Sequence, residues 1–163
     1  MSVLWGGYMN RLGLRKLSLE FRRLSSNLLN STDDTADINL SRFLKFINGN
    51  ELISGIIQDK ISGVDYDFKE CYDIGSADWA DYTPPVDEAC HIKAQYDYLN
   101  FINNENTVNV RSQAMNYCWS DKKINTIIQN FLDMAFKPLI DYINDQLSME
   151  MIVYGRKYIY SEY

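Results

Sequence analysis

The stretch INTIIQNFLDMAFKPLIDYINDQL, residues 124–147, decides the fold class, because its apolar residues return every three or four positions. That period places them on one stripe of an α-helix. The stripe consists of Ile124, Ile128, Phe131, Ala135, Leu139, Tyr142, Ile143 and Leu147. Pro138 lies inside the pattern. Proline lacks an amide N–H and clashes with the preceding turn, so we predict a long helix, starting near residue 120, that is kinked at Pro138.

The same period recurs towards the N-terminus. It predicts helices over residues 10–30, 37–48, 51–62 and 86–104, with Asp37 and Asn50 as the N-caps of the second and third. A shorter helix is expected over 107–118. Polar or glycine-containing breaks separate these segments, and Gly63 is placed to end the third.

Two segments do not follow the helical period. We expect a short helix over residues 64–74 and then a loop that ends at Pro84 and Pro85. Residues 151–163 are rich in aromatic and β-branched side chains, which favours a strand pair or an extended arm. Continuation of the preceding helix is the alternative there. The sequence therefore predicts an all-α protein: a bundle of five to six helices over residues 1–150, with 151–163 as a C-terminal arm or linker, β or extended.

Length and composition restrict the class of protein. A chain of 163 residues fits one domain, and it has no apolar run long enough to span a membrane. Its three cysteines are odd in number and widely spaced, which favours reduced thiols in the cytoplasm over a disulfide framework. The first residues lack the features of a signal peptide, so we expect a cytoplasmic protein without a membrane partner.

The net charge of −6 is unevenly distributed. Residues 1–30 carry five basic residues against Glu20 alone, whereas residues 64–88 carry eight acidic residues against Lys69 alone. The simplest interpretation is two solvated faces of opposite sign. The alternative is that the basic helix meets an anionic partner, or that the acidic segment meets a basic one.

No motif for a named reaction is present. His91 is the single histidine, and its neighbour Cys90 points about 100° away on a helix, so the two do not converge on a metal. Asp65 and Asp67 begin a calcium-loop pattern that fails at Lys69. A phosphate-binding glycine loop and a serine nucleophile elbow are also missing. We therefore assign no catalytic residue, no metal site and no cofactor, and expect a protein that is not an enzyme.

Candidate partner-binding residues lie at the two ends of the chain. Arginines on the first helix and tyrosines near the C-terminus are residue types common at interface anchors. The candidates are Arg11, Arg15, Arg22, Arg23, Tyr154, Tyr158 and Tyr160.

Three segments together carry a family resemblance: KLSLEFRRLS at 16–25, FLKFINGNELI at 43–53 and FLDMAFKPLIDYINDQL at 131–147. In this order they resemble the helical N-terminal region of bacterial proteins from abortive-infection and other anti-phage or toxin-like loci. None of the segments is catalytic, so no active-site residue carries over. The resemblance implies a sensing, docking or oligomerising role.

The leading hypothesis is therefore a non-enzymatic helical interaction, oligomerisation or sensing module of bacterial antiviral defence, with a protein partner or a second copy of itself. One alternative is a metal-dependent nuclease-type toxin that uses acidic residues of 64–88. The other is nucleic-acid binding through the basic first helix, for which a row of arginines is sufficient.

Overall fold

In the computed structural model, the described backbone covers residues 10–74, 80–117 and 123–161, and the described side chains end at Tyr154. Within these ranges all regular structure is helical, which confirms the all-α fold class. The elements are α1 (Arg11–Leu29), α2 (Ala36–Gly49), α3 (Glu51–Ile61), the 3-10 turn η2 (Phe68–Glu70), α4 (Glu88–Asn104), α5 (Val110–Tyr117) and α6 (Ile124–Ser161).

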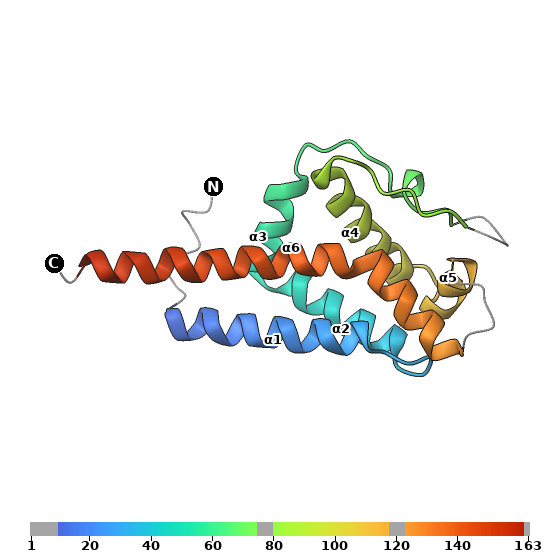
Figure 1. Ribbon diagram of the computed structural model, residues 1–163, viewed down its shortest axis with the longest axis horizontal. Coiled ribbons are helices and arrows are strands. Elements are labelled where there is room, and N and C mark those ends of the chain that lie inside the picture. Colours follow the sequence, from blue (N-terminus) through green and yellow to red (C-terminus); the bar gives the residue numbers. More distant parts are fainter. Residues whose placement is uncertain (1–9, 75–79, 118–122, 162–163) are drawn as a thin grey trace.

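The longest helix organises the bundle. α6 runs antiparallel to α1 along one side of the molecule, and α2, α3, α4 and α5 pack around this pair (Figure 1). At about 1.5 Å per residue, the 38 residues of α6 span about 57 Å, whereas the 19 residues of α1 span about 28 Å. The C-terminal part of α6 therefore extends past the start of α1 (Figure 1).

The core forms where the apolar stripes meet. Leu14, Leu17, Phe21 and Leu28 of α1 are buried, as the helical period predicts. A second group of side chains surrounds Tyr98 of α4, whose ring lies 4.2 Å from that of Tyr72 between centroids. The further rings around Tyr98 are those of Phe68, Phe101, Phe131 and Phe136.

Short polar side chains fix where the helices start. The Oδ1 atoms of Asn10 and Asn50 accept the amide N–H groups of Gly13 and Ile53 at 2.7 and 3.0 Å. Each bond satisfies one of the free donors in a first helical turn. Gly63 follows the end of α3 with a φ of 75°, a left-handed conformation that favours glycine.

Asp37 does not cap α2 as predicted. It lies inside the first turn of α2, and its carboxylate accepts the amide N–H of Val110, the first residue of α5, at 2.9 Å. The cap position belongs to Thr35, which makes no side-chain capping bond. Asp37 therefore joins two helices that are far apart in the sequence, which no local pattern could indicate.

The segment between α3 and α4 is less helical than predicted. Of residues 64–74, only the single turn η2 is helical, and an isolated antiparallel bridge joins Tyr72 to Tyr82. Two consecutive residues after this turn, Cys71 and Tyr72, are both buried in the core. The prediction of a short helix over residues 64–74 is therefore wrong.

The C-terminal prediction also needs correction. Residues 151–161 continue α6 as helix rather than forming a strand pair or an extended arm. Starting a helix is the unfavourable step, whereas each residue added to an existing one gains a hydrogen bond. An established helix therefore overrides the weak β-preference of these residues. The start predicted for this helix, near residue 120, lies outside the described residues, and the described helix begins at Ile124.

Candidate functional site

Three of the predicted partner-binding arginines share one face of α1. Arg11, Arg15 and Arg22, which we call the arginine stripe, line a cavity between α1 and α6. Arg22 also donates from Nε to Oδ1 of Asn144 on α6 at 3.2 Å. Arg23 does not line this cavity, and its guanidinium lies 3.7 Å from the carboxylate of Glu20. The structure therefore brings three of the four arginines together.

The tyrosines predicted to bind a partner are all on α6. Tyr154 is half-buried and packs against the core, so it serves packing as well as any contact it makes. The side chains of Tyr158 and Tyr160 lie outside the described residues.

The C-terminal part of α6 exposes aliphatic side chains. Leu147 is the last fully buried residue of α6 among those described. Beyond it, Met149 and Ile152 are each 58% exposed and Val153 is 46% exposed. Spacings of three and four residues place them on one side of the helix. We call residues 148–161 the α6 extension.

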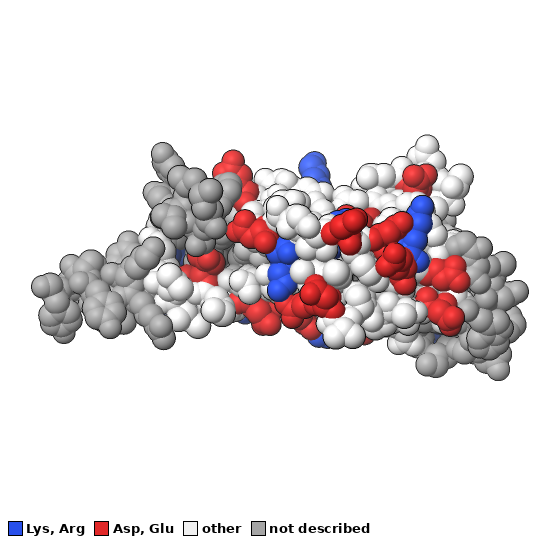
Figure 2. All heavy atoms as spheres, turned by 90° about the horizontal axis from the view of Figure 1, so that it is seen from above, with Lys and Arg blue, Asp and Glu red and all other residues white. Residues whose placement is uncertain are grey.

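The described parts of the acidic segment, residues 64–74 and 80–88, lie on the opposite side of the molecule from α1 (Figure 1). Acidic side chains are spread over the face seen from above, with a few basic ones among them (Figure 2). Within the described part of the chain, no ion pair joins α1 to this segment. The two charged regions are therefore separate faces, as the simplest interpretation of the charge pattern predicts.

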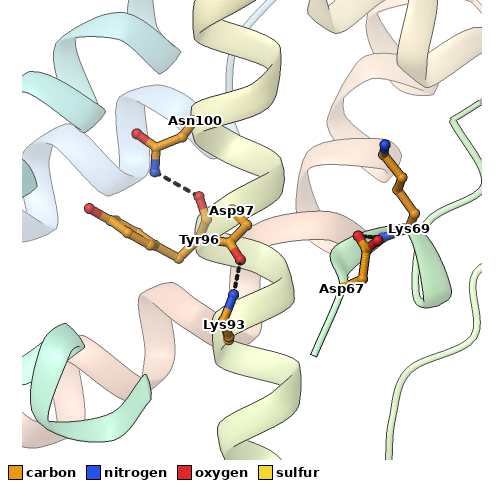
Figure 3. A network of polar contacts seen from close by, with 6 residues as sticks. All are labelled: Asp67, Lys69, Lys93, Tyr96, Asp97 and Asn100. Atoms are coloured by element: carbon orange, nitrogen blue, oxygen red, sulfur yellow. Dashed lines mark hydrogen bonds and ion pairs between the residues drawn. The ribbon is translucent and has the colours of Figure 1, made fainter. Parts of the chain in front are cut away.

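Several carboxylates of this region have structural partners. Asp67 accepts the amide N–H of Lys69 at 3.0 Å and so begins η2, while Asp97 of α4 is 2.5 Å from the ammonium group of Lys93 (Figure 3). Asp87 accepts the amide N–H of Cys90 at 3.0 Å and caps α4, and these hydrogen bonds lower its pKa. Glu88 pairs with Lys60 at 2.9 Å.

Metal ligands do not gather among the described residues: no group of three or more histidine, cysteine, aspartate or glutamate side chains could hold an ion there. Asp67, one of the acidic residues of 64–88, precedes η2 and accepts the amide N–H of Lys69 within that turn (Figure 3).

His91 lies in a buried polar network rather than beside a reactive thiol. Its Nε2 is 2.6 Å from the hydroxyl of Tyr82 and 3.2 Å from Nε2 of Gln95. Burial raises the pKa of Cys71 to about 11, and it also raises that of Cys90. A nucleophilic cysteine needs the opposite shift, because the thiolate is the reactive form.

The network continues to the kink of α6. The amide N–H of Leu139, which would normally bond to the carbonyl of Ala135, donates to Oε1 of Gln95 at 2.7 Å. The carbonyl of Ala135 accepts the hydroxyl of Tyr72 at 2.9 Å. Two backbone groups at Pro138 are thus satisfied by side chains from other elements, and α6 bends in its N-terminal half (Figure 1). We call Tyr72, Tyr82, His91 and Gln95 the kink network.

The direction of the hydrogen bonds fixes the charge of His91. Because Oε1 of Gln95 accepts from Leu139, the NH₂ group of Gln95 faces the imidazole and can only donate. Nε2 of His91 must therefore accept, which requires a neutral ring with its proton on Nδ1. The pKa of His91 agrees with a neutral ring. Burial is the largest influence and lowers this pKa, whereas the negative charge of Glu88 raises it.

Sequence reasoning missed Gln95, Tyr72 and Ser18. Gln95 is fully buried on the core side of α4, where a polar residue signals a specific bond. Pro138 was the available clue, since a proline in a buried helix frees backbone groups that need partners. The partner itself is not predictable from local sequence.

Comparison with known proteins yields no match to a family model, a curated protein or a solved structure. None of the helices in the described part of the chain combines the length and the hydrophobicity that a membrane span requires.

Proposed function

We propose that this chain is a non-enzymatic helical interaction module and that two copies associate through the α6 extension. The observation that carries the proposal is the exposure of Met149, Ile152 and Val153 on one side of a helix that continues past Leu147, its last fully buried residue among those described. Isolated exposed aliphatics are ordinary, whereas a group of them on one projecting element is typical of a protein contact.

A second copy fits this surface better than an unrelated partner. Two-fold symmetric pairing uses one patch twice, and an aliphatic helix face is complementary to itself. The order of charges supports an antiparallel pairing: Glu150 precedes Ile152 and Val153, and Arg156 and Lys157 follow them in the sequence. Two antiparallel helices crossing near Val153 would bring residues of opposite charge to the same level.

The short interface sets the expected affinity. The α6 extension of 14 residues is about 21 Å long at about 1.5 Å per residue. An interface of this length is at the small end for specific complexes, so we expect a dissociation constant on the order of micromolar.

Sedimentation velocity over a concentration range tests this proposal. The chain of 19.0 kDa should shift from monomer to dimer as its concentration rises. Ile152→Glu and Val153→Glu should each keep the chain monomeric, because dimerisation would bury a charge. Ile38→Glu is the matched control, since Ile38 is 50% exposed on α2. A chain that stays monomeric at all concentrations, or a dimer that survives both substitutions, would refute the proposal.

We also propose a role in bacterial antiviral defence, which rests on the three segments that resemble abortive-infection proteins. These segments lie in α1, at the α2–α3 junction and in α6, which pack against one another in the bundle. A plaque assay with cells that express the chain tests this role. Fewer plaques for the natural chain than for Ile152→Glu would support it, and equal plaque numbers with and without the chain would refute it.

A further inference from the structure

A cavity of about 390 Å³ lies between α1, from Arg11 to Arg22, and the C-terminal part of α6. Its described lining consists of Arg11, Arg15, Ser18, Leu19, Arg22 and Met151. This volume is in the range of small-molecule sites, about 300–1,000 Å³. The lining combines three cations, one hydroxyl and two apolar side chains.

The cations are aligned by the helix itself. Arg11, Arg15, Ser18 and Arg22 follow at steps of four, three and four residues, which puts them on one stripe of α1. No carboxylate is among the described residues that line the cavity. Asp133 and Asp141 line the adjoining cavity beyond Arg22, and Asp141 is 2.7 Å from the ammonium group of Lys137. No described carboxylate therefore faces the stripe from across the cavity.

Ser18 supplies independent evidence for a ligand. Its side chain is 3% exposed, and its hydroxyl has no hydrogen-bond partner among the described residues. Two other serines in helices bond to the carbonyl four residues earlier: Ser25 to Phe21 at 2.7 Å and Ser148 to Asn144 at 3.0 Å. Buried polar atoms rarely lack a partner. Ser18 is thus a residue of the cavity lining whose hydroxyl, itself buried, makes no hydrogen bond within the described part of the chain.

We propose that this cavity binds a small phosphorylated molecule. Guanidinium groups match the oxygens of a phosphate in geometry and charge, and three of them with one hydroxyl suit a phosphate monoester dianion. Leu19 and Met151 supply apolar contacts for the organic part of the ligand. The site and the proposed dimer contact use different residues: the stripe, Ser18 and Met151 line the cavity, whereas Met149, Ile152 and Val153 form the contact.

Isothermal titration calorimetry on the whole chain tests the site, with adenosine 5′-monophosphate as the probe. Adenosine without the phosphate is the ligand control. Arg15→Gln and Ser18→Ala should each weaken binding about tenfold or more, because each removes a hydrogen bond to a charged group. Arg23→Gln is the matched control on the same helix and should bind like the natural chain.

Three outcomes would overturn the proposal. The first is no binding of the monophosphate or of inorganic pyrophosphate at millimolar concentration. The second is an equal loss of affinity for Arg23→Gln and Arg15→Gln. The third is binding of a 12-nucleotide single-stranded DNA but of neither small phosphate, which would point to a nucleic-acid surface. Thermal unfolding adds a separate check: Ser18→Ala should not lower the stability of the free chain, since its hydroxyl makes no bond there.

Discussion

Replacing Gln95 by leucine should destabilise the protein, even though Gln95 lies away from any ligand cavity. Leucine is similar in volume, so the α4 packing is kept, but the acceptor for the amide N–H of Leu139 is removed. That group is buried beside Pro138, and an unsatisfied buried donor costs about 1–3 kcal/mol. The bond to His91 is lost as well. We expect a loss of about 2–3 kcal/mol in the free energy of unfolding, which is roughly 5–10 °C in melting temperature.

Urea unfolding followed by circular dichroism measures this loss, and Gln58→Leu is the control because Gln58 is exposed on α3. The control should change stability by less than about 0.5 kcal/mol. Hydrogen exchange gives a local readout, since the amide of Leu139 should lose protection in Gln95→Leu. If Gln95→Leu lowers the free energy of unfolding no more than the control does, the amide of Leu139 does not need Gln95 as its acceptor.

A double-mutant cycle with Pro138→Ala tests the cause. Alanine removes the ring clash and allows the N–H of Leu139 to bond again to the carbonyl of Ala135. The penalty of Gln95→Leu should therefore shrink by about 1 kcal/mol or more in the Pro138→Ala background. An identical penalty in both backgrounds would show that Gln95 does not act through the kink.

Three further predictions concern the same scaffold. Burial lowers the pKa of His91, so the unfolded chain binds the proton more tightly than the folded chain. The free energy of unfolding should therefore fall on acidification below a pH of about 6.5. His91→Gln should flatten this pH dependence between about 5 and 7, and an unchanged slope in urea titrations would contradict the prediction. Tyr72→Phe leaves the buried carbonyl of Ala135 without its hydroxyl donor and should cost about 1–2 kcal/mol in chemical denaturation, whereas a neutral result would mean that water replaces the bond. Asn50→Ala removes the cap on the amide of Ile53 and should lower the free energy of unfolding by about 1 kcal/mol. Asn50→Gly should lower it by only about a few tenths of a kcal/mol. Equal effects of the two substitutions would argue against capping.

Local pattern predicted most of the fold, because a helix is specified by residues three and four apart. The stripe of Leu14, Leu17, Phe21 and Leu28 and the cap at Asn50 are both local features, and the structure confirms them. The alignment of Arg11, Arg15 and Arg22 was predictable for the same reason.

The predictions failed where distant residues decide the outcome. Asp37 bonds to Val110, 73 positions later, and Gln95 to Leu139, 44 positions later. Nothing near either residue in the sequence specifies the partner. Residues 151–161 failed for a different reason, since their own preference competes with a helix that already exists. That Met151 faces the arginine stripe likewise depends on how α1 and α6 pack.

The buried polar atoms separate scaffold from candidate site. In the kink network, side chains bond to backbone groups freed by Pro138, and Tyr98 is bonded to Gln113 in the same core. These groups have their partners within the chain, so they stabilise the bundle and need no ligand. Ser18 is the exception among the described residues.

Three unsatisfied features lie along α1 and the C-terminal part of α6, toward the end of the molecule at which α6 extends past α1 (Figure 1). The hydroxyl of Ser18 lacks a partner, the arginine stripe lacks a counter-charge in its cavity, and Ile152 lacks apolar cover. A folded chain on its own rarely leaves three different kinds of interaction unmet in one region. Because a bound anion would complete the first two and a second copy would cover the third, this end is where we place the protein's function.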